Sequence, residues 1–297
     1  MWDELEFAFA LLVSGLSIGL MYSLIALGFV LIYKATDAIN FAQGEFVMLA
    51  GFMATTALAA SLPIWAAIAA AILGMILLSF VLERTVLRPL LGRPVVAVIM
   101  ATIGLAAILR GLPPITIGAQ TKALPLPIGD DPITVWTAVI PPVQVVGVIV
   151  SVGFLAVFTW FFLKSRMGIA MRAVADNQQV AMAMGINVER YFAIAWAMAG
   201  VVSALGGIIW GSMLGVDTQL SLIGLKVFPV VILGGLDSIV GAVVGGLIVG
   251  VVESIAAGYL DPYVGGGTKD FAPYVLMILT LMFKPYGLFG THRIERV

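Results

Sequence analysis

"FVMLAGFMATTALAASLPIWAAIAAAILGMILLSFVL", residues 46–82, decides the fold, because it carries no charged side chain over 37 consecutive positions. A helix needs about 20 apolar residues to cross the hydrocarbon core of a bilayer. The stretch is therefore long enough for two membrane spans. "SLP" at 61–63 predicts the turn between them, since proline favours an extended residue before it.

The rest of the chain has the same apolar character. Of its 297 residues 62% are hydrophobic and 10% charged, whereas roughly one-quarter of the residues of a soluble domain are charged. We predict an integral membrane protein that forms a single transmembrane domain over residues 1–297. The start, MWDELEF, lacks the basic patch and cleavage site of a secretory signal, so the first hydrophobic segment is expected to remain as a span.

Metal and disulfide chemistry has little support in the composition. The chain has no cysteine, which excludes disulfides and thiolate metal ligands. Its one histidine, His292, has no second histidine or cysteine to complete a metal site, and we interpret it as an interface residue. No metal site is predicted.

The charge-free segments predict an all-α fold, a polytopic transmembrane helix bundle with about eight to nine membrane-crossing segments. In the region 227–256, Pro229, Gly234, Gly235 and Asp237 interrupt the apolar run, and a charge at mid-membrane costs roughly 2.5–3.5 kcal/mol. We expect a broken or re-entrant region there, made of two short pieces that meet near Asp237. Single spans are expected at residues 7–33, 95–109, 143–163, 191–214 and 273–289.

Lysine and arginine placement predicts the orientation. With the N-terminus outside and two crossings in 227–256, eleven of the 15 basic residues fall inside. Such an excess is the positive-inside bias of membrane proteins. The four basic residues expected outside are Arg110, Lys122, Lys226 and Lys269.

Small residues recur at four-residue spacing on several of these segments. Lipid is as apolar as leucine, so helices associate in it by close backbone approach and hydrogen bonding. We interpret the small-residue ladders as helix contacts, with lining of a substrate path as the alternative. They are Gly15/Gly19, Ala199/Ser203/Gly207/Gly211, Gly241/Gly245 and Gly246/Gly250.

The longest loop expected inside is KSRMGIAMRAVADNQQVAMAMGINVER, at about 164–190. Met171, Val174, Gln178 and Ala181 follow helical spacing, which predicts one or two short helices outside the membrane. Gly185 is expected to end the helical part. The residues leave two roles open, contact with lipid headgroups and docking of another protein.

Asn40, Gln43 and Glu45 lie in "AINFAQGEF", residues 38–46, between two apolar segments. We expect them at the cytoplasmic end of the first hairpin, with Asn40 and Gln43 on one helical face and Glu45 roughly 180° from Asn40. Glu45 is expected to pair with a basic residue from the same membrane side. Polar groups here favour either a path or gate lining or hydrogen bonds that hold the hairpin.

Other polar residues inside the apolar segments carry the same two alternatives. Glu253 is interpreted either as a path or gate residue or as a member of an interhelical pair. The same alternatives stay open for Asp237, because the break expected at Gly234 and Gly235 would unwind the backbone, and unwound backbone at membrane depth is tolerated where protein or a cavity covers it. Four hydroxyl residues favour helix contacts over substrate contacts. They are Tyr22, Ser23, Thr102 and Ser203.

Several blocks, in order along nearly the entire chain, carry a resemblance to a known family. They are "GLMYSLIALGFVLIYKATDAINFAQGEF" at 19–46, "ERTVLRPLLGRP" at 83–94, the loop residues Gly168, Arg172, Ala173, Asp176, Asn177, Ala181 and Gly185, "FPVVILGGLDSIVGAVVGGLIVGVVE" at 228–253 and "KPYGLFG" at 284–290. The chain resembles membrane permease subunits of ABC importers for branched-chain and other hydrophobic amino acids. It is more similar to the shorter of the paired permeases.

The resemblance implies a function and partners. It implies a multi-pass subunit of the bacterial inner membrane that is not an enzyme and moves amino acids by alternating access. The partners implied are a second permease subunit or a second copy, two cytoplasmic ATPases that bind ATP and Mg, and a periplasmic substrate-binding protein, with no nucleic acid. The loop at 164–190 is implied to be the coupling loop that the ATPases push. The chain itself has no phosphate loop, since "VGGGTKD" at 264–270 departs from G-x-x-x-x-G-K-[ST].

Other substrates and another class of transporter stay open. Importers of the same kind for urea, amides or aromatic acids are similar to this chain. A secondary transporter driven by an ion gradient is the further alternative, and it predicts converging intramembrane carboxylates and an inverted repeat. An intramembrane enzyme is disfavoured, because no nucleophile with a base is evident at mid-span.

Overall fold

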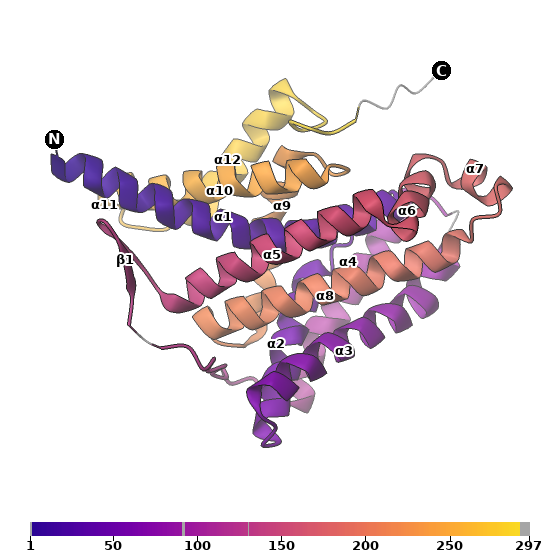
Figure 1. The fold of residues 1–297 in the computed structure, drawn as a ribbon, viewed down its shortest axis with the longest axis horizontal. Helices are drawn as coiled ribbons and strands as arrows, with labels where there is room; N and C mark the ends of the chain where they lie inside the picture. The colour runs from indigo at the N-terminus through magenta and orange to yellow at the C-terminus, as the bar shows by residue number, and fades with distance from the viewer. Residues whose placement is uncertain (1, 91–92, 130, 292–297) are drawn as a thin grey trace. The chain divides into compact units, whose positions relative to one another are not determined.

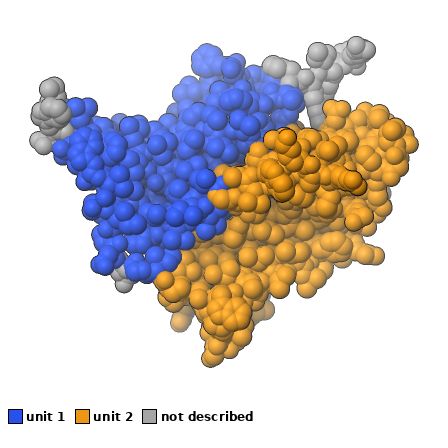
Figure 2. Space-filling model, viewed as in Figure 1, with its two compact units in different colours: residues 1–26, 128–152, 225–297 blue, residues 27–127, 153–224 orange. Residues whose placement is uncertain are grey.

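A computed structural model describes residues 2–90, 93–129 and 131–291 of the 297-residue chain. His292, and the basic Arg293 and Arg296 of the orientation count, lie outside these described residues. The chain forms two compact units, which Figure 2 shows in blue and orange. Unit 1 comprises Met1–Ala26, Ile128–Val152 and Leu225–Val297, and unit 2 comprises Leu27–Pro127 and Gly153–Gly224.

Helices make up nearly all of the regular structure (Figure 1). The chain order is α1 (Trp2–Thr36), α2 (Gln43–Ala59), α3 (Ile64–Leu82), α4 (Val95–Thr116), β1 (Ile133–Val135), β2 (Ala138–Ile140), α5 (Pro142–Lys164), α6 (Arg166–Asp176), α7 (Gln178–Ala183), α8 (Val188–Leu214), α9 (Leu222–Gly234), α10 (Ile239–Tyr259), α11 (Asp261–Val264) and α12 (Thr268–Phe283). A π-helical turn, Glu83–Leu87, and 3₁₀ turns, Arg88–Leu90 and Thr218–Ser221, complete the helical part.

Six helices within the described residues are long and apolar enough to cross a membrane. The all-α bundle is therefore confirmed, whereas the expected eight to nine crossings are not. The difference lies in the shorter apolar helices, since α2 has 17 residues, α9 13 and α12 16. The six are Glu4–Thr36, Ile64–Leu90, Val95–Thr116, Pro142–Lys164, Val188–Leu214 and Ile239–Tyr259.

The turn predicted in the charge-free stretch is confirmed. Helix α2 ends at Ala59, and α3 begins at Ile64, directly after Pro63. Ser61 adopts a positive φ of 61° in the turn. Helices α2, α3 and α8 pack on one another, and Figure 1 shows α3 and α8 running side by side.

Three predicted boundaries were wrong. The span expected at 95–109 continues to Thr116, because Pro113 and Pro114 lie inside the last turn without ending it. The second piece of the 227–256 region is α10, a full-length helix of 21 residues. The span expected at 273–289 begins five residues earlier, at Thr268, and ends at Phe283, where the chain turns through Gly287 at a φ of 77°.

The break predicted near Asp237 is confirmed inside unit 1. Helix α9 ends at Gly234, Gly235 has a φ of 107°, and α10 begins at Ile239 with Ser238 accepting a hydrogen bond from the Gly241 amide. The carbonyls at the end of α9 are not left bare. The amides of Leu288 and Phe289 donate to the carbonyls of Leu233 and Gly234 at 2.8 and 3.0 Å. The C-terminal segment thus replaces the helical hydrogen bonds that the break removes.

The small-residue ladders act as helix contacts, as predicted. In unit 1, a Cβ on Gly19 would lie 2.5 Å from the carbonyl oxygen of Gly246, so α1 and α10 touch through their backbones. In unit 2, a Cβ on Gly207 would lie 2.2 Å from the carbonyl oxygen of Val47. Close approach of this kind brings backbone and hydroxyl groups of neighbouring helices within hydrogen-bond reach.

A two-stranded antiparallel sheet in unit 1 was not predicted. Strands β1 and β2 pair with Ile133 opposite Ile140. Trp136 turns the hairpin at a positive φ of 56° and packs on Phe9, with ring centroids 5.1 Å apart. Packing on the first helix therefore anchors this two-stranded sheet.

Candidate functional site

The polar segment at the start of α2 lies deep in unit 2. The Gln43 amide donates to the Ser203 hydroxyl at 2.9 Å, and Ser203 is near the middle of α8. A Cβ on Gly28 would lie 2.2 Å from the Gln43 amide nitrogen, and Gly28 precedes the end of α1 by eight residues, roughly 12 Å. The chain therefore turns back along α1 before α2 begins. Asn40, Gln43 and Glu45 lie at the connection between α1 and α2, as expected, but this connection lies alongside α1 instead of beyond its end, and its membrane side stays a prediction.

Asn40 and Gln43 touch, although not on a shared helical face. Asn40 precedes α2, its side-chain Oδ1 accepts from the Ala42 backbone amide at 3.1 Å, and its Nδ2 lies 3.5 Å from the Gln43 Oε1. The Thr102 hydroxyl, on α4, accepts from the Phe41 amide at 3.3 Å. Asn40, Gln43, Thr102 and Ser203 are at most 1% exposed. Hydrogen bonds that hold the returning segment are thus present, and a path role for these residues stays a prediction.

Glu45 pairs with a basic residue that the sequence did not single out. Arg110 of α4 donates to the Glu45 Oε1 through Nη2 at 2.5 Å and through Nε at 3.1 Å. The predicted pairing with a basic residue is confirmed, whereas the separate expectations that Glu45 lies at the cytoplasmic end and Arg110 outside do not fit this direct contact. The signal that could have found it was an arginine inside an otherwise charge-free apolar helix of 22 residues.

A second charged cluster lies in unit 1. The Tyr22 hydroxyl donates to the Glu253 Oε1 at 3.2 Å, and the Lys226 Nζ lies 3.4 Å from the same oxygen. Lys226 also pairs with Asp270 at 2.7 Å. Of the two roles left open for Glu253, interhelical pairing is the one with contacts, and Tyr22 makes the helix contact predicted for it. Sequence reasoning missed Lys226 and Asp270.

Asp237 holds the C-terminal segment. Its carboxylate accepts from the Thr291 amide, at 3.2 and 3.3 Å from the two oxygens, and from the Thr291 hydroxyl. The carboxylate thereby ties the chain after α12 to the break between α9 and α10. A path role for Asp237 stays a prediction.

The loop at 164–190 forms two helices, as predicted. Ser165 and Asn177 begin α6 and α7, each accepting a backbone hydrogen bond from three residues onward, at 2.9 and 3.0 Å. Gly185, at a φ of 82°, ends α7, and the amides of Gly185 and Ile186 donate to the carbonyls of Met182 and Ala181. This pair of hydrogen bonds is a Schellman motif, which favours glycine at the position of positive φ.

The predicted apolar face of this loop is buried. Met171, Val174 and Ala181 are at most 6% exposed, and the Gln178 amide donates to the Ala35 carbonyl of α1 at 3.2 Å. Gly168 packs on the end of α5, since a Cβ there would lie 2.3 Å from the Phe162 carbonyl oxygen. The outer face carries the exposed residues Ala173, Asp176, Asn177, Val180 and Met184.

Arg172 fastens α6 to α5. Its guanidinium donates to the Phe162 carbonyl and lies 5.5 Å from the centre of the Phe162 ring. Cations at a helix C-terminus complement its dipole, and a cation over an aromatic face adds to this attraction. Arg172 therefore holds the loop to its span, a role that differs from presenting a surface to a partner.

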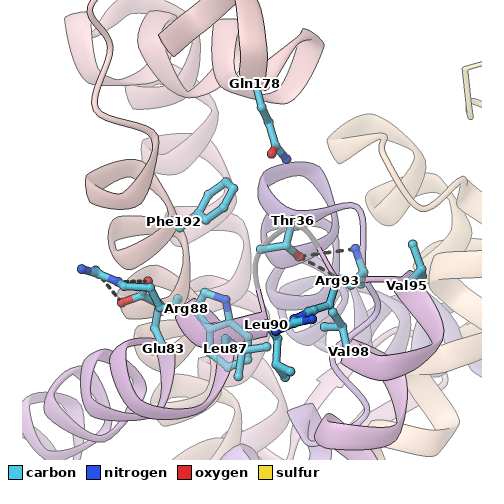
Figure 3. A pocket seen from close by; sticks show the side chains of 12 residues that line it. Thr36, Glu83, Leu87, Arg88, Leu90, Arg93, Val95, Val98, Gln178 and Phe192 are labelled. Atoms are coloured by element: carbon cyan, nitrogen blue, oxygen red, sulfur yellow. Dashed lines mark hydrogen bonds and ion pairs between the residues drawn. The ribbon is translucent and has the colours of Figure 1, made fainter.

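A cavity of about 70 Å³ lies beside the loop. Figure 3 shows Gln178 pointing from α7 toward Thr36 at the end of α1, with Arg88 and Glu83 paired on the other side of the cavity. Arg88 contacts Glu83 through two hydrogen bonds, at 3.0 and 3.1 Å, and Glu189 through one, at 3.0 Å. Glu83 and Arg88 are five residues apart, and the π-helical turn brings them together. Arg88 thus links the end of α3 to the start of α8, directly after the loop.

Known proteins match the chain over nearly its full length. A family model described as "Branched-chain amino acid transport system / permease component" matches residues 11–283. The branched-chain amino acid permease BraD of Pseudomonas aeruginosa is 33% identical, over 96% of this chain and 97% of its own. LivH of Salmonella typhimurium is 31% identical over 96% of both chains. A probable LivH of Methanocaldococcus jannaschii is 30% identical over 90% and 88%.

A solved structure shares the fold. PsaBC from Streptococcus pneumoniae in complex with Fab has a TM-score of 0.50 at 13% identity, over 94% of this chain and 92% of that one. The six apolar helices and the relatives place the chain in the bacterial inner membrane, as expected. The chain belongs to the family of permease components of branched-chain amino acid transport systems.

Proposed function

We propose that this chain is the transmembrane permease subunit of an ATP-driven ABC importer that moves branched-chain or other hydrophobic amino acids by alternating access. The chain would work with a second permease subunit or a second copy, with two cytoplasmic ATPases that bind ATP and Mg, and with a periplasmic substrate-binding protein. Hydrolysis belongs to the ATPases. Family membership supports the importer class, and the substrate and partners are the proposed part.

The two-helix loop carries this proposal. Its inner face is fixed to unit 2 by Gln178 and Arg172, whereas Asp176, Val180 and Met184 are exposed, the last two at 57% and 78%. The outer face of the two helices combines acid, amide and apolar groups. Such a surface suits docking of another protein better than burial among lipid headgroups.

The contacts of the loop also provide a route for motion. Gln178 touches α1, Arg172 touches α5, and α8 begins three residues after Gly185. Arg88 joins the start of α8 to α3 through Glu189. A push on α6 and α7 therefore reaches four spans through direct contacts, which is what an alternating-access subunit requires.

Uptake in proteoliposomes tests the function. The full set of components with ATP inside should import leucine when the loaded binding protein is outside, and should not import it with ADP. Urea, an amide or an aromatic acid as the preferred cargo would correct the substrate. Uptake by this chain alone under a proton or sodium gradient would overturn the ABC assignment in favour of a secondary transporter.

Docking is tested by co-purification with the ATPases. Asp176→Arg reverses an exposed charge, and Gly185→Val forces a side chain into a backbone region that favours glycine. Both variants should lose ATPase association while their amounts in the membrane stay unchanged. Asp131→Arg, which changes an exposed acid in a different loop, is the matched control. Unchanged co-purification of both loop variants would count against the docking assignment.

A further inference from the structure

The Arg110 guanidinium is hydrogen-bonded to Glu45 on one side and exposed on the other. Its Nη2 and Nε donate to Glu45, whose side chain is 2% exposed, while the Arg110 side chain is 47% exposed. No second carboxylate among the described residues pairs with it. The guanidinium has five N–H donors, so several remain for another partner.

The exposed part of the Arg110 guanidinium does not lie at the C-terminal end of α4, the helix end nearer to it. Arg110 lies six residues before Thr116, but side chains of a helix lean toward its N-terminus, and Glu45 holds the guanidinium at the start of α2. That start lies at the level of Ser203, near the middle of α8. The guanidinium therefore does not extend along its stem to the membrane surface, as a snorkelling arginine does.

The face of α4 around Arg110 is exposed. Thr102, Leu105, Leu109 and Pro113 form the buried face of the helix. On the other side Gly104, Ala107 and Gly111 are exposed, and a Cβ added to either glycine would meet nothing within 4 Å. Ala107 is three residues from Arg110, so the two side chains are neighbours on the helix surface.

A half-exposed guanidinium at this depth is incompatible with a lipid-facing surface. Charged side chains inside membrane spans face the bundle interior or a water-filled cavity, because exposure to hydrocarbon costs several kcal/mol. We propose that this face of α4 lines the water-filled translocation path and that Arg110 binds the carboxylate of the transported amino acid. The inference rests on the proposed function and adds the chemical group that the path recognises.

The chemistry of the pair suits such a contact. A guanidinium binds a carboxylate through parallel N–H donors, and Glu45 fixes its orientation. Because Glu45 already balances its charge, the hold on a second carboxylate is weak. Weak binding allows the substrate to leave again, as conduction along a path requires.

Cysteine labelling tests whether the face is wet. The chain has no cysteine, so Ala107→Cys and Gly111→Cys need no altered background. In the assembled importer in vesicles both should favour the anionic sulfonatoethyl methanethiosulfonate over the cationic trimethylammonium reagent several-fold, after each rate is divided by the rate of that reagent with a free thiol. Arg110→Gln should abolish this preference. Leu77→Cys, 65% exposed on α3, is the lipid-facing control and should react with neither.

Uptake supplies a second readout. Arg110→Gln should lower leucine import at sub-saturating leucine about tenfold while ATP hydrolysis by the complex stays within twofold, since a lost charge-assisted hydrogen bond weakens one contact of the cargo. Arg110→Lys should restore part of the rate, and Lys122→Gln should leave it unchanged.

Two outcomes would overturn the inference. Unreactive cysteines at 107 and 111 would mean that a second subunit or lipid covers the face, and equal rates for both reagents after division by their rates with a free thiol would mean that Arg110 exerts no attraction on anions there. A wild-type complex that imports no leucine would sink the proposed function instead, since labelling requires no transport.

Discussion

Glu45 and Glu253 are both carboxylates inside apolar helices, and the two units stabilise them in different ways. Glu253 is 7% exposed and shares one oxygen between Tyr22 and Lys226, while Lys226 has a second acid in Asp270. Glu45 is 1% exposed, and Arg110 is its one ion-pair partner among the described residues. The cation of the first cluster is 24% exposed and divided between two acids, and the cation of the second is 47% exposed. We call the first cluster closed because its cation pairs with two acids of its own unit, although the buried Glu253 Oε2 has no hydrogen-bond partner among the described residues, and the second open because its half-exposed cation can take a further ligand.

The largest effect should come from Glu45→Ala, which leaves the Arg110 guanidinium unpaired. A guanidinium cannot shed its charge, and breaking a buried pair by removing one partner costs about 3–5 kcal/mol. We expect the lower end, about 3 kcal/mol, because Arg110 is half exposed. Thermal unfolding of the purified chain in detergent measures it. A melting temperature equal to the wild type would show that the pair does not hold the fold.

A smaller effect should follow Lys226→Met in the closed cluster. The carboxylate of Glu253 keeps the Tyr22 hydroxyl and can take up a proton, so the loss should be about 2 kcal/mol. Lys269→Met, at an exposed neighbour of Asp270, is the matched control in the same unfolding assay. A loss as large as that of Glu45→Ala would erase the distinction between the two clusters.

Tyr22→Phe should cost less again, about 1 kcal/mol, because it removes one hydrogen bond while the Lys226–Glu253 pair remains. Unfolding of the single variants and of Tyr22→Phe combined with Lys226→Met forms a double-mutant cycle. The two changes should be non-additive. Additive losses would mean that Tyr22 and Lys226 act on Glu253 independently.

The smallest effect concerns Asp261, a carboxylate outside the spans. Hydrogen bonds from the Thr268 hydroxyl and amide, at 2.5 and 2.8 Å, lower the pKa of Asp261 below its ordinary 3.8. A lowered folded pKa stabilises the fold above the ordinary value, and this stability is lost as pH falls from 3.8 through the folded pKa. Asp261→Asn should therefore flatten the acid limb of the unfolding curve slightly. An unchanged acid limb would contradict the contribution of this carboxylate.

The pattern of apolar and polar residues carried much of the fold and part of the candidate site. The turn at 61–63, the break at Asp237 and the two-helix loop were predicted, because each depends on neighbours in sequence: a proline, paired glycines and helical spacing. The orientation and the path roles of the polar residues stay predictions. The β1–β2 hairpin was not predicted, because strands of three residues are too short to give a periodic hydrophobic pattern.

By itself, the sequence determined that this chain is a polytopic helical membrane protein and determined the permease family that it belongs to, because hydrophobic length and ordered motifs are local properties. Only the tertiary structure decided that α2 starts deep in unit 2, that Arg110 is the partner of Glu45, and that Lys226, Asp270 and Tyr22 surround Glu253. Glu45 and Arg110 are 65 positions apart in the chain, and Tyr22 and Glu253 are 231 positions apart. Helix packing through small residues brings the two partners of each pair together, and no short segment of the sequence contains both partners.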